Sequence, residues 1–125
     1  MFDLTGKVAV VTGGSGILGR TMCAGLAKQG ATVMILDRNP ESGEALKAEI
    51  LASGYQADFF ETDVLNLDVL KGVREKILSK YGHIDILING AGGNMPKASI
   101  QPDQRFIDLD VNAVRAVIDL NYFGT

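Results

Sequence analysis

Lys7–Arg20 reads KVAVVTGGSGILGR, and this stretch decides the fold. Its apolar run, Val8–Val11, is rich in β-branched residues and is typical of a parallel strand buried on both faces. The turn Gly13–Gly19 follows and contains the spacing G-x-G-x-x-G, after which apolar residues recur at helical spacing. Such a turn between a strand and a helix can hold a pyrophosphate on free backbone N–H groups at the positive end of the helix dipole.

The glycines of this turn have separate expected roles. Gly14 permits the tight turn, Gly16 lets the backbone approach the phosphates, and Gly19 lets the helix pack closely on the strand. An acidic residue, Asp37, closes the next apolar run about 20 positions further on, which is the context that this motif requires. The sequence therefore predicts a dinucleotide-binding site.

Strand and helix patterns alternate along the rest of the chain. The predicted strands cover residues 7–12, 32–37, 56–62 and 84–89, and the predicted helices cover residues 17–29, 40–53, 66–81 and 110–124. This alternation predicts one α/β domain over residues 1–125, a doubly wound parallel sheet (Rossmann fold) with strand order 3-2-1-4. In that order, Gly13–Gly19 and Asn89–Gly93 meet in a crevice at the carboxyl ends of the first and fourth strands.

Each of the four predicted helices carries an apolar or small-residue face. These faces comprise Leu18, Met22, Leu26 and Ala27 in the first helix, Ala45, Ala48, Glu49 and Ala52 in the second, Leu67, Leu70, Val73, Ile77 and Leu78 in the third, and Val111, Val114, Ile118 and Tyr122 in the last. The single cysteine, Cys23, lies within the first helix and is expected to be a buried thiol rather than a reactive one.

Composition argues against several classes of partner. The 125 residues carry a net charge of −3 and no basic tract, so nothing favours nucleic acid or an acidic membrane surface. No apolar run approaches the roughly 20 residues that span a bilayer, and the chain does not start like a signal peptide; a cytoplasmic protein is predicted. His83 is the only histidine, and no metal site is predicted.

Asp37 and Arg38 give opposing indications about the nucleotide. A carboxylate at the end of the second strand can accept hydrogen bonds from both hydroxyls of the adenosine ribose and repels a 2′-phosphate, which favours NAD over NADP. Arg38 can hold a 2′-phosphate, or it is a solvated arginine in the turn before Asn39. NAD is the predicted cofactor.

Four short motifs, in order, resemble the short-chain dehydrogenase/reductase family, and the resemblance covers the whole chain. They are the turn Thr12–Gly19, the pair Asp63-Val64, the segment Asn89–Gly92 and, on the last helix, Asn121. The resemblance implies that Asp63 hydrogen-bonds the adenine amino group, that Val64 packs on the adenine ring, and that Asn89–Gly92 lines the crevice beside the nicotinamide-side ribose. The expected cofactor-binding residues are Gly13, Gly14, Ser15, Gly16, Ile17, Leu18, Gly19, Asp37, Arg38, Asp63, Val64, Asn89, Gly90, Ala91 and Gly92.

Two departures from the family pattern point to a subgroup. The middle glycine of the turn is Gly16, one place before the family position at Ile17, and the second asparagine of N-N-A-G is replaced by Gly90. The segments that resemble the branch reducing fructuronate to mannonate are residues 88–98, 106–110 and 119–121.

The resemblance also implies a catalytic asparagine, whose backbone carbonyl holds a water in a proton relay. Asn121 matches this position, because Asn121–Gly124 reproduces the family pattern N-x-x-G. Asn112 is the alternative, on the wording of Asp110-Val111-Asn112.

Family catalysis further uses a serine and a tyrosine that is followed four positions later by a lysine. The tyrosines here are Tyr55, Tyr81 and Tyr122, and none has a lysine at that spacing. Family members carry these groups in their second half. The chain is therefore expected to be the amino-terminal half of such an enzyme and to be inactive alone.

Three functions stay open at the level of sequence. The first is an NAD-dependent oxidoreductase that moves a hydride to or from a small molecule, either a sugar acid or another substrate such as a 3-oxoacyl thioester. The second is a dinucleotide-binding module without turnover, and the third is a flavin- or phosphate-binding protein of another doubly wound family. A homo-oligomer is also expected, because the fourth strand presents an apolar edge.

Overall fold

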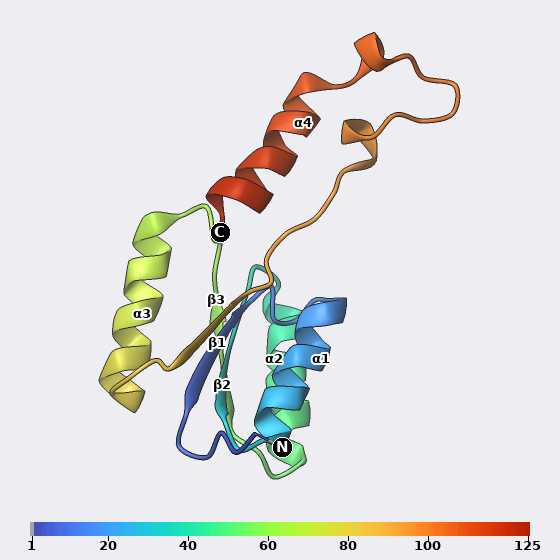
Figure 1. Ribbon diagram of the computed structural model, residues 1–125. Helices are drawn as coiled ribbons and strands as arrows, with labels where there is room; N and C mark the ends of the chain where they lie inside the picture. Colours follow the sequence, from blue (N-terminus) through green and yellow to red (C-terminus); the bar gives the residue numbers. More distant parts are fainter. Residues whose placement is uncertain (1) are drawn as a thin grey trace.

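The structure is a computed structural model that describes residues 2–125, and strands and helices alternate along it (Figure 1). The strands are β1 (Val8–Thr12), β2 (Thr32–Asp37), β3 (Ala57–Glu61) and β4 (Ile86–Asn89). The helices are α1 (Ile17–Lys28), α2 (Pro40–Ala52), α3 (Leu67–Tyr81) and α4 (Val111–Ile118), with short 3-10 turns η1 (Pro96–Ala98) and η2 (Phe106–Asp108) and a π-helical segment η3 (Asp119–Phe123).

The four strands form one parallel sheet in the order β3-β2-β1-β4, as the sequence predicts. Val10 in β1 lies opposite Met34 in β2 on one side and Leu87 in β4 on the other. β4 begins two residues later than predicted. Asp85 lies outside the strand, and its carboxylate accepts a hydrogen bond from the backbone amide of Val8 at 2.8 Å.

Helices cover both faces of the sheet, with α1 and α2 on one face and α3 on the other (Figure 1). The alternation of side chains along a strand divides β1 between two cores. Ala9 and Val11 belong to the core under α1 and α2, and Val8 and Val10 to the core under α3. β1 is therefore buried along its whole length.

The apolar face predicted for α1 is correct only in part, because Ala27 is buried and Leu26 packs against the core, but Leu18 and Met22 do not. Leu18 is 74% exposed and Met22 is 39% exposed, whereas Gly19, Cys23 and Ala27 are buried. The reason is close approach, because this helix begins directly against the backbone of the glycine-rich turn. Only small residues fit between the helix and the sheet at that distance.

The predicted small-residue face of α2 also points outward. Ala45, Ala48, Glu49 and Ala52 are exposed, and the buried residues of this helix are Gly43, Leu46 and Ile50. Burying two large aliphatic side chains removes more apolar area from water than burying alanines does. Leu46 and Ile50 therefore determine which side of the helix faces the sheet.

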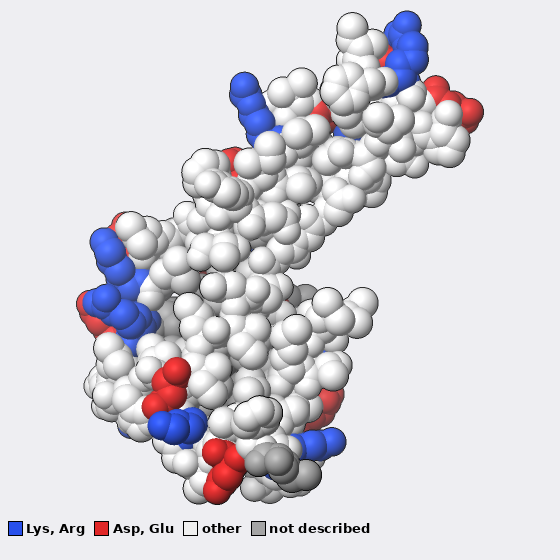
Figure 2. Space-filling model, viewed as in Figure 1, with Lys and Arg blue, Asp and Glu red and all other residues white. Residues whose placement is uncertain are grey.

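Residues 93–110 and α4 form an arm that rises from the carboxyl edge of the sheet (Figure 1). Of the stripe predicted for the last helix, Val111, Ile118 and Tyr122 are exposed, and Ala113 is the buried residue of α4. On the face drawn in Figure 2 the charged side chains lie mainly at the periphery, and the centre of that face is uncharged. None of the helices within residues 2–125 combines the length and the apolar character that crossing a bilayer requires.

Candidate functional site

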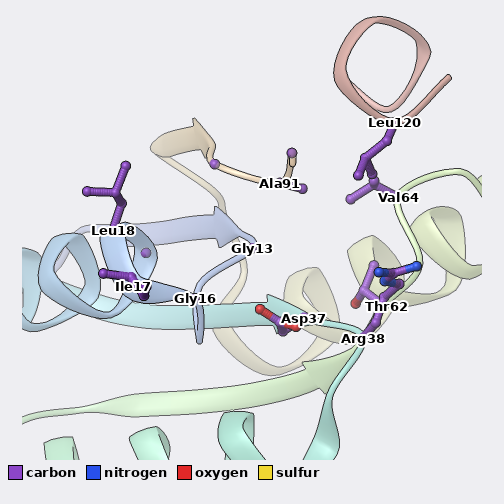
Figure 3. Close-up of a pocket in the computed structure, with 13 residues that line it drawn as sticks. Gly13, Gly16, Ile17, Leu18, Asp37, Arg38, Thr62, Val64, Ala91 and Leu120 are labelled. Atoms are coloured by element: carbon purple, nitrogen blue, oxygen red, sulfur yellow. The ribbon is translucent and has the colours of Figure 1, made fainter. Parts of the chain in front are cut away.

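A crevice of about 340 Å³ opens at the carboxyl edge of the sheet, where the glycine-rich turn, β2, β4 and the end of the arm meet (Figure 3). It is lined by Gly13, Gly16, Ile17, Leu18, Gly19, Asp37, Arg38, Thr62, Val64, Gly90, Ala91, Gly92 and Leu120. The structure thus brings eleven of the fifteen predicted cofactor-binding residues to one cavity. The four that lie outside its lining are Gly14, Ser15, Asp63 and Asn89.

The turn after β1 is held against the segment after β4. Gly13 has φ +65°, and a Cβ there would lie 2.7 Å from the carbonyl oxygen of Gly90. The hydroxyl oxygen of Thr12 accepts hydrogen bonds from the amides of Gly90 at 3.1 Å and Ala91 at 3.2 Å. The left-handed residue of the tight turn is thus Gly13 rather than Gly14, which corrects the predicted role.

Gly14 packs inward, away from the crevice. A Cβ on it would lie 3.0 Å from Cγ2 of Ile35 and 3.3 Å from Sγ of Cys23. Cys23 is fully buried, as predicted, and burial raises the pKa of its thiol to about 12. A Cβ on Gly19 would collide with the backbone of Gly13, so α1 starts in direct contact with the turn.

The first turn of α1 is the only one among the four α-helices of residues 2–125 without a side-chain cap. Asn39, Asn66 and Asp110 each accept two backbone N–H groups at the starts of α2, α3 and α4. At α1 the N-cap residue is Gly16, which offers no side chain, and the first turn contains no acidic residue. The amides of this turn therefore face the crevice with their hydrogen-bonding capacity unused by a cap.

Asp37 projects into the crevice from the end of β2 (Figure 3). Its Oδ2 accepts a hydrogen bond from the amide of Ser15 at 3.1 Å, and its Oδ1 accepts one from the amide of Asn39 at 3.2 Å. An ionised carboxylate has about four acceptor positions, so capacity for further donors remains. Arg38 lines the same end of the crevice and lies beside Thr62 in Figure 3.

The wall opposite the glycine-rich turn is made by Thr62, Val64 and Leu120 (Figure 3). Sequence reasoning identified Val64 but missed Thr62 and Leu120, and it missed Thr12 as the residue that joins the two loops. Within residues 2–125, Thr12 and Thr62 are the two buried polar residues, at 6% and 2% exposure. The available signal was a threonine at the end of a strand for Thr12 and directly after a strand for Thr62.

Asp63 and Asn89 are two of the four predicted residues that lie outside the crevice lining. The Asp63 carboxylate accepts a hydrogen bond from the amide of Leu65 at 2.9 Å, within its own loop. Asn89 lines a different hollow, an apolar one on the α3 side of the sheet that also includes Val73 and Leu87. The structure thus separates these two side chains from the predicted cluster.

Asn121 is on η3, and its side chain contacts the segment that follows β4. Its Nδ2 donates to the carbonyl of Gly93 at 2.7 Å and to that of Val117 at 2.8 Å, and its Oδ1 accepts from the amide of Gly93 at 3.1 Å. Its own carbonyl accepts the Thr125 hydroxyl at 3.2 Å. The alternative residue, Asn112, is exposed in the first turn of α4, far from these contacts along the helix.

The model of the short chain dehydrogenase family matches residues 7–125. The chain belongs to that family. The sequence is 41% identical over 130 residues to an uncharacterized oxidoreductase, UxuB, of Bacillus subtilis, an alignment that covers 98% of this chain and 47% of the relative. The chain therefore spans about half the length of the relatives it matches.

Solved structures of related proteins superpose closely on this chain. A candidate D-mannonate oxidoreductase from Haemophilus influenza, solved with bound NAD, has a TM-score of 0.91 and 38% identity, over 98% of this chain and 48% of the other. An NAD⁺-bound xylitol dehydrogenase has a TM-score of 0.86 and 28% identity, over 97% of this chain and 44% of the other. These matches support a nicotinamide cofactor for the family fold.

Proposed function

We propose that the crevice binds NAD, with the pyrophosphate at the start of α1 and the adenosine ribose at Asp37. The observation that carries the proposal is the pairing of an uncapped helix start with a carboxylate held by two amides in one cavity. The helix start favours an anion. The carboxylate favours hydroxyl donors and disfavours a 2′-phosphate, so NAD is preferred to NADP.

The remaining lining residues suit the adenine and the second ribose. Val64 and Leu120 offer an apolar wall for the ring, and Gly90–Gly92 offer bare backbone at the other end of the crevice. Asp63, one residue before Val64, is proposed to hydrogen-bond the adenine amino group after its loop adjusts, and Asn89 to support the segment that follows it. Ser15 and Gly14 are proposed to shape the turn.

Titration calorimetry of the 125-residue chain with NAD, NADP and FMN tests this proposal. NAD is expected to bind tightest, and FMN not to bind. Asp37→Ala is expected to weaken NAD binding roughly 10- to 100-fold, because hydrogen bonds to a charged acceptor contribute about 1.5–3 kcal/mol each. Equal affinity of the wild type and the variant for NAD would contradict the assignment of the ribose to Asp37.

We further propose that the chain is part of an NAD-dependent oxidoreductase acting on a ketone or secondary alcohol of a sugar acid such as fructuronate or mannonate. The support is the similarity to the candidate D-mannonate oxidoreductase. NAD, when bound, supplies the hydride chemistry. The chain's own residues bind and orient it, and Asn121 is proposed to hold a relay water on its backbone carbonyl, which keeps one acceptor position beyond Thr125.

A dinucleotide-binding role without turnover is the second candidate. It is favoured by the absence of a Tyr-x-x-x-Lys spacing from the 125 residues. With NAD and D-mannonate, the NADH absorbance is expected to increase no faster in the presence of the purified chain than in its absence. Turnover that follows the protein through purification would contradict this expectation.

Assembly and location stay predictions. A homo-oligomer is proposed because Leu87 on the edge strand β4 is 59% exposed, and Val111 and Ile118 on α4 are exposed as well. Light scattering after size exclusion is expected to give a mass above the 13.3 kDa of one chain. A small-molecule substrate and a cytoplasmic location belong to the same proposal.

A further inference from the structure

We propose that Ser42 is a positioning residue for nucleotide selection, because it closes a ring of hydrogen bonds that fixes the Asp37 carboxylate. This inference rests on the proposed function of the crevice as an NAD site. Ser42 does not line the crevice. It would act on the nucleotide only through Ser15 and Asp37.

The ring has four members and returns to its starting residue. Asp37 accepts the amide of Ser15 at 3.1 Å and the amide of Asn39 at 3.2 Å, one on each carboxylate oxygen. The hydroxyl oxygens of Ser15 and Ser42 lie 2.8 Å apart, and the Ser42 hydroxyl donates to the carbonyl of Asn39 at 3.3 Å. The ring joins the glycine-rich turn, the end of β2 and the start of α2.

The donor roles in the ring follow from the number of protons. Ser42 has one hydroxyl proton and uses it on the carbonyl of Asn39. Ser15 must therefore donate to Ser42 across the 2.8 Å contact. This holds the Ser15 residue against α2 and aims its amide at Asp37. Both serines are half-buried, which shields the contact from water.

The position of Ser42 is set by its neighbour on α2. A Cβ on Gly43 would collide with the ring of Phe59 in β3, so the first turn of α2 lies directly on the sheet. This close approach brings Ser42 within reach of the glycine-rich turn. Without the Ser42 hydroxyl, the hydrogen bond between Thr12 and Gly90 remains, but Ser15 of the turn loses its hydrogen bond to α2.

A carboxylate fixed at both oxygens keeps its remaining acceptor positions in one direction. Binding of the ribose hydroxyls then costs little side-chain conformational entropy, because the carboxylate is already ordered. For the same reason the carboxylate cannot move to avoid a 2′-phosphate, which it repels. Loss of the ring is thus expected to weaken NAD binding and to spare NADP binding. The observable is the ratio of the two affinities.

The experiment measures Kd for NAD and NADP with the wild type, Ser42→Ala, Ser42→Thr, Asp37→Ala and the double variant Ser42→Ala/Asp37→Ala. Ser42→Ala is expected to lower the NAD-to-NADP preference roughly fivefold, the size of one hydrogen bond. Ser42→Thr keeps the hydroxyl and is expected to retain the preference. In the Asp37→Ala background, Ser42→Ala is expected to change NAD affinity less than about twofold.

Ser53→Ala is the matched control, since Ser53 is also a serine of the α2 region, and its hydroxyl donates to the carbonyl of Glu49 at 3.0 Å. It is expected to leave both affinities unchanged. If Ser42→Ala weakens NAD and NADP equally, or weakens NAD as much without Asp37, Ser42 is merely structural and the inference is wrong. If Ser42→Ala does not fold, Ser15→Ala breaks the same contact and decides the question by the same ratio. If the wild type binds NADP but not NAD, the proposed function is wrong as well. Failure of the proposed function is thus distinguishable from failure of the inference on Ser42 alone.

Discussion

Asn121 holds the backbone of Gly93 at two points, donating to its carbonyl at 2.7 Å and accepting from its amide at 3.1 Å. Gly93 is where the arm leaves the crevice, and Asn121 lies at the end of the arm's helix. The two ends of the arm are therefore joined by one side chain. A leucine, which is similar in size, could form neither of these hydrogen bonds.

Asn121→Ala is expected to lower the free energy of unfolding by about 1–3 kcal/mol, because it leaves two backbone groups of Gly93 unpaired. It is also expected to raise the hydrogen-exchange rate of the Gly93 amide. Asn112→Ala is the control, since Asn112 is exposed, and a change within about 0.5 kcal/mol is expected there. Equal effects of the two variants would contradict the role of the Gly93 contact.

Two glycines of α1 give opposite predictions. Gly19→Ala places a methyl group against the backbone of Gly13, so it is expected to cost about 1–3 kcal/mol and to abolish NAD binding. Gly25→Ala meets nothing within 4 Å and is expected to stabilise the helix by about 0.5–1 kcal/mol. Urea unfolding of both variants measures the difference. Comparable stability of the two would show that the turn can move aside.

Asp58 on the edge strand β3 forms salt bridges with lysines from both faces of the sheet. Lys47 of α2 lies 2.9 Å from Oδ1, and Lys80 of α3 lies 2.7 Å from Oδ2. Burial alone would raise the pKa of this carboxyl, but hydrogen bonds from Lys80, Lys47 and the amide of Phe59 outweigh it and lower the pKa to about 2. The charges also protect the strand edge from pairing with another chain.

This lowered pKa predicts acid sensitivity. The stabilisation is complete above the ordinary value of 3.8 and is lost as the pH falls through about 2, since the unfolded chain binds the proton more readily. The loss for the wild type is expected to be about 2 kcal/mol in urea unfolding between about pH 5 and about pH 2. Asp58→Asn should lose that part of the pH dependence. Asp103→Asn, on the exposed arm, is the control and should retain it.

Cys23 is expected to resist thiol reagents. With the pKa of the thiol raised to about 12 and the side chain fully buried, the thiolate is scarce and inaccessible near neutral pH. A disulfide reagent should label the chain stoichiometrically in urea and only slowly without it. Rapid labelling of the folded chain would mean that α1 separates readily from the turn.

The sequence was sufficient for the strand order and for most of the crevice, because both depend on local patterns. Val8–Val11 and the glycine spacing are contiguous, and Asp37 follows at a fixed distance. The sequence was insufficient for predicting which face of a helix is buried, because tertiary packing determines that face. Periodicity assigned Leu18 and Met22 to the inner face of α1, although contact between Gly19 and the turn leaves room only for small residues.

Long-range contacts explain the other omissions. Leu120 reaches the crevice only because the arm folds back, and no spacing near residue 120 indicates that. Thr12 directly precedes the glycine-rich turn, but its hydrogen bonds to Gly90 and Ala91 span about 80 positions of sequence. Ser42 gave no signal at all, since its partner Ser15 lies 27 residues away.

The contact between Gly19 and Gly13 involves main chain only, with no side chain between the helix and the turn. Main-chain atoms are the same in every residue type, so substitution cannot fine-tune this contact; it can only keep or destroy it. Adaptation to a different nucleotide is therefore expected at Asp37 and its neighbours, which present side chains that can be exchanged one at a time.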